Sequence, residues 1–353
     1  MAKKRKTLPK DFGDIISSKD IEAFKRVFET SEINARGGYG KATALSFYRI
    51  PNDFVRWLVE NGADMEAVDT YNRTALHEQA SLRGSDISVF LELGANIHAV
   101  DTYGDTPLHF ASGSGFNPEA VKLLIEHGAN VKALNTYKQT PLERALSRAN
   151  NIDLPNLVEV SKLLLAVDGT ITQKMKDFVT RKGEDFEFHR DNFNKDYLQE
   201  TDEALSNLYE IFDVAPVKRR IMHDGITPIV VNGTWQEQYE KLWELLVPSK
   251  GSANTVQGEV IRVSGKVRDE IYRNGGGNWD ADFRKMLDSL LVNFSSGNPL
   301  TDADLAEGQG IVKYIRKNAD GNDDGIHFLC ELANRWVQKN PNPMKLVKPN
   351  YRR

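Results

Sequence analysis

Carboxylates and basic side chains gather in one stretch of the chain at spacings that could support acid–base chemistry. They occur at helical intervals before a glycine-rich turn and directly after it: Glu259, Arg262, Lys266, Glu270, Asp280 and Asp282. Carboxylate and guanidinium groups on facing helices can move protons to and from a substrate. The same residue types also cap helices and form surface ion pairs, and a catalytic site usually adds a histidine or a nucleophile. The structural interpretation is therefore favoured.

A second pattern, at residues 320–331, fits the spacing of a calcium-binding loop. Asp320, Asn322, Asp324 and Glu331 stand at the ligand positions, where oxygen atoms would bind Ca²⁺. The ninth residue of such a loop is usually polar, but here it is Phe328. The sequence also has no second loop of this kind with which the first could pair. An aspartate that caps the following helix explains the same residues. We therefore predict no cofactor, with Ca²⁺ at this loop as the alternative.

The composition narrows the classes of protein to consider. The chain has 353 residues, of which 40% are hydrophobic and 27% charged, with a formal net charge of -4. This profile excludes wholesale disorder and disfavours a non-specific nucleic-acid binder, which is usually strongly basic. No apolar run is long enough to span a membrane. Cys330, the single cysteine, favours a reducing, cytoplasmic compartment, and its apolar neighbours predict a buried side chain rather than a nucleophile.

The elements of the first half repeat. Three similar phrases start at Asp69, Asp101 and Asn135 and read DTYNRTALH, DTYGDTPLH and NTYKQTPLE, and a degraded copy, GGYGKATALS, starts at Gly37. The three full copies are 32 and 34 residues apart. A leucine-rich helix and a closing glycine follow each phrase, at Gly62, Gly94 and Gly128 in the clearest cases. Because glycine adopts the left-handed conformation easily, these residues are expected to end the helices.

The start of each repeated helix is equally readable. Thr106 is expected to cap the helix and Pro107 to occupy its first position, where the missing N–H costs nothing. A period near 33 residues with T-P-L-H and G-A-N phrases resembles the ankyrin-repeat family. The resemblance implies repeats at 36–68, 69–100, 101–134 and 135–172, with a capping half-repeat at 12–35 whose outer helix extends over 21–35. It also implies that His77 and His109 make structural hydrogen bonds rather than bind metal.

Arrays of this family generally bind proteins through hairpin tips and the inner-helix face. A tyrosine stands at each expected tip: Tyr39, Tyr71, Tyr103 and Tyr137. Tyrosine offers a large contact area and freezes few torsions, which suits an interface. Packing of tip against tip along the array is an equally weighted explanation. The neighbours Arg73, Asp105 and Lys138 differ in charge and predict a polar rim, and Ser81, Leu82, Ser114 and Arg148 fall on the inner-helix face.

The second half lacks the period and is predicted to be mostly helical. Residues 1–11 are expected to form a basic disordered tail, 173–200 a connector, 201–340 a helical domain and 341–353 a second tail. Gly258 and Gly265 lie within an expected helix one heptad apart, which predicts the close approach of another helix. The fold class is therefore all-α, an ankyrin-repeat solenoid followed by a globular helical domain of no family that the sequence identifies.

These observations favour a non-catalytic adaptor in the cytoplasm that binds a protein partner and neither a specific nucleic acid nor a membrane. A narrower hypothesis is a bacterial protein that neutralises a toxin or regulates an enzyme, and it predicts one tight, stoichiometric partner. The alternative is an enzyme with Glu259, Arg262, Asp280 and Asp282 lining its site and the array as its targeting module. The oligomeric state stays open.

Overall fold

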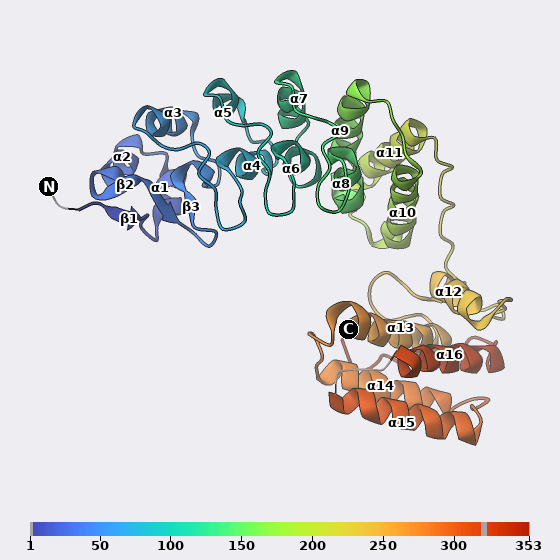
Figure 1. Cartoon of the computed structure of the whole chain (residues 1–353). Coiled ribbons are helices and arrows are strands. Elements are labelled where there is room, and N and C mark those ends of the chain that lie inside the picture. The colour runs from blue at the N-terminus through green and yellow to red at the C-terminus, as the bar shows by residue number, and fades with distance from the viewer. Residues whose placement is uncertain (1–2, 319–322, 353) are drawn as a thin grey trace. The chain divides into compact units, whose positions relative to one another are not determined.

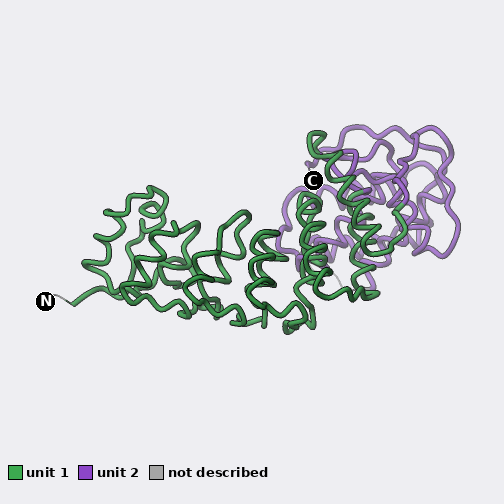
Figure 2. The backbone as a smooth tube through the Cα atoms, turned by 90° about the horizontal axis from the view of Figure 1, so that it is seen from above, with its two compact units in different colours: residues 1–186, 194–217 green, residues 187–193, 218–353 purple. Residues whose placement is uncertain are grey.

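The computed structural model describes residues 3–318 and 323–352 of the chain. It is mostly helical and separates into two compact units, which Figure 2 distinguishes by colour. Unit 1 comprises residues 1–186 and 194–217, and unit 2 comprises residues 187–193 and 218–353. The predicted solenoid and helical domain are therefore confirmed as fold classes. Among the described helices, none is both long and apolar enough to cross a membrane.

Unit 1 begins with a small sheet that the sequence did not predict. Its strands β1 (Arg5–Thr7), β2 (Ser31–Gly37) and β3 (Ala42–Thr43) lie in that order, with β1 parallel and β3 antiparallel to β2. Helices α1 (Phe12–Ser18) and α2 (Ile21–Thr30) lie between β1 and β2. Two predictions are therefore wrong: residues 5–7 are not disordered, and the outer helix ends at Thr30. The strand at residues 5–7 and the end of the helix at Thr30 both depend on pairing between distant segments of the chain, which local sequence patterns do not reveal.

The repeats form two rows of helices in unit 1 (Figure 1). The inner row consists of a 3₁₀ turn (Ala44–Ser46), α4 (Ala75–Ala80), α6 (Pro107–Gly113) and α8 (Pro141–Arg148), and the outer row of α3 (Asn52–Glu60), α5 (Ser88–Glu92), α7 (Pro118–Glu126) and α9 (Leu154–Val167). Thr106 caps α6 as predicted, because its side chain accepts the N–H of His109. Gly62, Gly94 and Gly128 have φ angles of 88°, 85° and 89°, which confirms their left-handed role.

Two further helices extend the array beyond the predicted repeats. Residues 173–200, expected to be a connector, instead form α10 (Gln173–His189) and the first turn of α11 (Lys195–Phe212). Lys182 of α10 donates to the carbonyl of Ala149 after α8, and α11 packs against α9. A Cβ atom at Gly183 would lie 1.9 Å from the hydroxyl of Tyr209, so glycine permits this helix pair to pack. A helix pair therefore packs on the end of the array.

Unit 2 is a bundle around one central helix. It contains α12 (Trp235–Leu246), α13 (Val256–Asn274), α14 (Ala281–Phe294), α15 (Asp302–Asn318) and α16 (Asp323–Lys339). Helix α13 packs against α12, α14 and α16 (Figure 1). A Cβ atom at Gly265 would lie 2.1 Å from the ring of Trp243, and one at Gly258 would lie 2.9 Å from the carbonyl oxygen of Leu246. Since both neighbours belong to α12, the predicted close approach of a helix is confirmed.

The segment after α16 is not a loose tail. Met344 accepts a hydrogen bond from the N–H of Val256 at 2.8 Å, and Lys345 forms an isolated bridge with Thr255. Tyr351 is buried. The sequence-based expectation of a tail at 341–353 is therefore wrong for the described residues, because a few specific hydrogen bonds hold the segment without any periodic apolar pattern.

Candidate functional site

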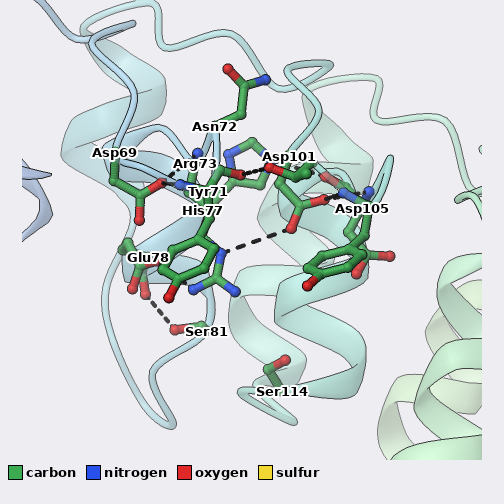
Figure 3. Close-up of polar contacts among 12 residues, drawn as sticks. Asp69, Tyr71, Asn72, Arg73, His77, Glu78, Ser81, Asp101, Asp105 and Ser114 are labelled. Atoms are coloured by element: carbon green, nitrogen blue, oxygen red, sulfur yellow. Dashed lines mark hydrogen bonds and ion pairs between the residues drawn. The ribbon is translucent and has the colours of Figure 1, made fainter. Parts of the chain in front are cut away.

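The hairpin tips of the array are built by one residue at the start of each repeated phrase. The Asp69 carboxylate accepts the N–H groups of Tyr71 at 2.8 Å and Arg73 at 2.9 Å, as Figure 3 shows. Asp101 and Asn135 accept the corresponding N–H groups two and four residues later. Such side-chain turns fix the backbone locally. The tips of the second, third and fourth repeats are therefore each held in one conformation before any partner binds.

Backbone hydrogen bonds then join successive tips into a ladder. The N–H of Thr102 donates to the carbonyl of Tyr71 at 3.0 Å, and the N–H of Thr136 donates to that of Tyr103 at 2.8 Å. The first rung differs, because Thr70 donates to Gly40 and not to Tyr39. Tyr39 therefore stands one residue out of register with the other tip tyrosines. The shift arises because Tyr39 and Thr43 are four residues apart, whereas the tyrosine and threonine of the later phrases are three apart.

The tip tyrosines pack along the ladder and also face solvent. The rings of Tyr103 and Tyr137 stack at 6.4 Å between centroids with an angle of 22°. The neighbouring Tyr39 hydroxyl is the main cause that raises the pKa of Tyr71. Tyr39 is nevertheless 93% exposed and Tyr137 is 65% exposed, whereas Tyr71 is half-buried. Packing between tips and exposure to solvent, weighed as alternatives from the sequence, occur together here.

Two apolar residues beside the tips were missed by sequence reasoning. Val100 and Leu134 immediately precede Asp101 and Asn135, and they are 48% and 62% exposed. Both residues end the segment that follows an outer helix, where the sequence pattern indicates only the end of a repeat. A large apolar residue directly before a turn-forming aspartate or asparagine was the sequence feature that could have predicted this exposed apolar surface. We call Tyr39, Tyr103, Tyr137, Val100 and Leu134 the tip surface.

The residues predicted as a polar rim do not share one position. Lys138 is exposed and has a φ of 53°, which matches Asn72 at 62° and Gly104 at 72°. Lys138 therefore occupies the left-handed turn position, and Gln139 is the true equivalent of Arg73 and Asp105. Asn72, Gly104 and Lys138 are the fourth residues of the three repeated phrases, and each has a positive φ.

Arg73 and Asp105 point toward the inner helices rather than the rim. Arg73 pairs with Glu78 at 3.1 Å and lies 3.8 Å from Asp101, and its guanidinium covers the rings of Tyr71 and Phe110 at 5.1 Å each. Figure 3 shows Arg73 between Glu78 and Asp101. These contacts hold Arg73 partly buried within the repeat stack.

Asp105 is buried and cannot serve as a surface contact, contrary to the sequence-based expectation. Its carboxylate pairs with Arg144 at 2.9 Å and accepts the amide of Asn135 at 2.8 Å. Burial lowers the pKa of Arg144, and the Asp105 carboxylate opposes that effect. The pair therefore links the third and fourth repeats through their interior.

The other inner-helix residues vary in exposure. Ser81 and Leu82 are half-buried, and the Ser81 hydroxyl donates to the carbonyl of Glu78 at 2.7 Å. Ser114 and Arg148 are exposed. The Ser114 hydroxyl accepts from Arg144 at 3.1 Å. This face is therefore polar and largely engaged in its own contacts, in contrast to the tip surface.

His77 and His109 connect successive repeats. Nδ1 of His77 accepts the N–H of Thr74 at 3.1 Å, and its Nε2 bonds to the carbonyl of Asp105 at 3.0 Å. His109 makes the same contacts with Thr106 and Gln139. Burial is the main cause that lowers the pKa of both imidazoles. These hydrogen bonds give both histidines the structural role that the sequence predicts. Among the described residues, no group of three His, Cys, Asp or Glu side chains lies close enough together to hold a metal ion.

The acidic and basic residues of unit 2 are distributed over several structural contacts. Glu259 and Arg262 form a buried pair at 2.6 Å. Burial alone would raise the pKa of Glu259, but the charge and hydrogen bonds of Arg262, together with the hydrogen bonds from Ala253 and Tyr351, lower the pKa overall. Asp280 caps α14 by accepting the N–H groups of Asp282 and Phe283. Asp282 pairs with Lys285 at 3.1 Å.

The expected calcium loop is only partly described. Asp320 and Asn322 lie outside the described residues. Glu331, the fourth candidate ligand, pairs with Arg335 at 2.6 Å.

Comparisons with known proteins agree with the repeat geometry. A family model described as ankyrin repeats, in three copies, matches residues 78–174. No family model matches the C-terminal region, and no curated protein matches the chain. The matched residues include Asp105 and His109 and end at the start of α10. The chain thus carries ankyrin repeats at residues 78–174, a module through which proteins bind other proteins.

Proposed function

We propose that the chain is a non-catalytic adaptor that holds a protein partner on the tip surface. The observation that carries this proposal is the row of exposed aromatic and aliphatic side chains on tips that are already fixed by side-chain turns and backbone hydrogen bonds. Large apolar side chains held rigidly lose little conformational entropy on binding. Soluble proteins rarely expose such groups in series without a binding role.

The non-catalytic part of the proposal rests on the carboxylates of unit 2. Glu259 is neutralised by Arg262, Asp280 caps a helix and Asp282 pairs with Lys285. Each of these carboxylates has a structural task, and Glu259 and Asp282 also bind the neighbouring residues Tyr351 and Arg352 after α16. This supports an adaptor over an enzyme.

The narrower role in toxin neutralisation or enzyme regulation stays a prediction. It requires one tight partner in a fixed ratio. Purification of the protein from its native cells at near-physiological salt, followed by measurement of the complex mass, tests that requirement. Recovery of the protein alone would count against the narrower role. It would not exclude weaker binding of a partner to the tip surface, which a separate experiment tests.

The tip surface itself is tested by affinity purification with mass spectrometry. We expect Tyr103→Ala with Tyr137→Ala to reduce recovery of the partner at least about tenfold, because the truncation of aromatic anchors typically costs more than 1 kcal/mol each. Tyr314→Ala is the matched control, since Tyr314 is an exposed tyrosine on α15 of unit 2. Unchanged recovery with the double variant, while the control also behaves as wild type, would refute the proposal.

A further inference from the structure

Residues 341–352 cross the start of α13 without forming a helix, and they pair with it at one bridge between Lys345 and Thr255. We call them the strap. The buried side chain of Gln257 reads the backbone at the beginning of this segment: its Nε2 donates to the carbonyls of Asn340 and Asn342 at 2.8 Å each, and its Oε1 accepts the N–H of Met344 at 3.0 Å. The N–H of Val256 adds a bond to the carbonyl of Met344 at 2.8 Å. The buried amide of Gln257 therefore binds the main chain of this segment, whatever side chains the segment carries.

The far end of the strap is held by side chains of α13 and α14. The Tyr351 hydroxyl donates to the buried Glu259 carboxylate at 2.7 Å. Burial is the main cause that raises the pKa of Tyr351 well above its ordinary range, so the phenol stays protonated and donates. Asp282 accepts the N–H of Arg352 at 3.2 Å, and Lys285 donates to the carbonyl of Asn350 at 3.3 Å. We call Thr255–Glu259 with Asp282 and Lys285 the strap site.

Between these two ends the side chains of residues 345–350 are exposed or half-buried, whereas Met344 and Tyr351 pack against the core of unit 2. Tyr351 is the one strap residue that is buried among those the structure describes, and Val347 is 84% exposed. Local opening is cheap where little apolar surface is buried and backbone groups face water. The strap can therefore leave while the helices stay packed.

The strap site keeps its chemistry when the strap leaves. Glu259 remains paired with Arg262 and bonded to the N–H of Ala253 at 3.0 Å, so the carboxylate stays ionised and can accept a hydroxyl. Gln257 lies in the first turn of α13 and remains in place with it. At one end of the site the Gln257 amide can then bind main-chain groups, and at the other end the Glu259 carboxylate can accept a tyrosine hydroxyl. Groups of these kinds bind extended peptides in other proteins.

We propose that the strap site is a peptide-binding site, filled in cis by the strap, that takes an extended tyrosine-bearing segment of a partner protein when the strap opens. The strap defines the ligand chemistry: an extended backbone for Gln257 and a tyrosine about seven residues later for Glu259. This site lies on unit 2 and is independent of the tip surface, so either proposal can fail alone.

The test uses the full-length chain with Tyr351→Ala and a fluorescein-labelled synthetic peptide with the sequence of residues 341–352. The variant loses its own anchor, so we expect saturable binding of the peptide to it and roughly tenfold weaker binding to the wild type, where the strap competes. A peptide with phenylalanine in place of Tyr351 should bind roughly tenfold more weakly, because it cannot donate to Glu259.

Absence of saturable binding to a folded Tyr351→Ala chain, or equal binding of the two peptides, would overturn the proposal. Hydrogen exchange on the wild type gives a second measurement that needs no variant. We expect the amides of Met344 and Arg352 to exchange at least about tenfold faster than that of Val263 in the middle of α13. Exchange of all three only through global unfolding would show that the strap does not open by itself, and would equally overturn the proposal.

Discussion

At the scale of the residue, the buried histidines give the array a built-in dependence on pH. His77 and His109 are buried, and each uses both ring nitrogens to join its own helix start to the next repeat. Nδ1 accepts a backbone N–H, so a proton there would remove that hydrogen bond. Burial also disfavours the charged ring, and both pKa values are therefore lowered below the ordinary value of 6.5.

The first prediction follows from these pKa values. Unfolded histidine binds protons below about pH 6.5 while the folded rings stay neutral, so the free energy of unfolding should fall as the pH drops from about 6.5 toward the folded pKa values. The loss should approach about 1.4 kcal/mol per pH unit for each histidine. Urea unfolding at pH 7.5 and 5.5 measures it. His77→Gln with His109→Gln should remove most of the difference, whereas the exposed His127→Gln should not; an unchanged difference in the double variant would contradict this account.

At the scale of the element, glycines inside helices mark where another helix needs the space. Gly265 lies in α13 against the ring of Trp243, and Gly183 lies in α10 against Tyr209. Gly310 lies in α15 with no atom within 4 Å of the position that a Cβ would take. These glycines share a helical setting and differ in what surrounds them, so their replacement by alanine should have opposite effects.

The second prediction is this difference in sign. Gly265→Ala should lower the free energy of unfolding of unit 2 by roughly 1–3 kcal/mol, because the methyl group forces Trp243 and α12 to move. Gly310→Ala should raise it by about 0.5–1 kcal/mol through better helix propensity alone. Urea unfolding of both variants gives the comparison. Stabilisation by Gly265→Ala would show that α12 does not approach α13 as described.

Element boundaries show how far the sequence could lead. The threonine caps and closing glycines were predictable because each depends on a few adjacent residues. The pair of helices α10 and α11 was not, since its charged surface obscured buried residues such as Phe186 and Leu208. The strap was missed because one tyrosine and one glutamine, far apart in sequence, hold it. At the tips, the positions of Tyr39 and Lys138 follow from the number of residues to the next threonine, so the sequence alone was sufficient to place them.

At the scale of the whole molecule, one ion pair ties the array together across a repeat. Arg83 belongs to the second repeat. It pairs with Asp153 in residues 150–155 of the fourth repeat, a segment between α8 and α9 that we call the insert. Repeats in such stacks usually contact only their neighbours. Asp153 is buried and Arg83 is half-exposed, so solvent screens the pair less than a fully exposed one. The insert, which interrupts the repeat pattern in the sequence, thereby bridges the third repeat.

The third prediction concerns the strength of this bridge. A double-mutant cycle with Arg83→Ala and Asp153→Ala should give a coupling energy of about 0.5–1.5 kcal/mol. The exposed pair Arg56 and Glu92, which joins adjacent repeats, is the control and should give about 0.3 kcal/mol or less. Unfolding of the array in urea supplies the four free energies for each cycle. Equal coupling energies would show that the insert adds no link across the third repeat.

The central claim, that a protein partner lies on the tip surface, is tested most directly by site-specific photo-crosslinking. A photoreactive phenylalanine analogue replaces Tyr103, Tyr137 or, as the control, Tyr314, in the full-length chain in its native cells. Our account predicts that irradiation gives one adduct of the same mass from positions 103 and 137 and none from position 314. The absence of an adduct at both tip positions, from a folded chain that still recovers its partner, would contradict it.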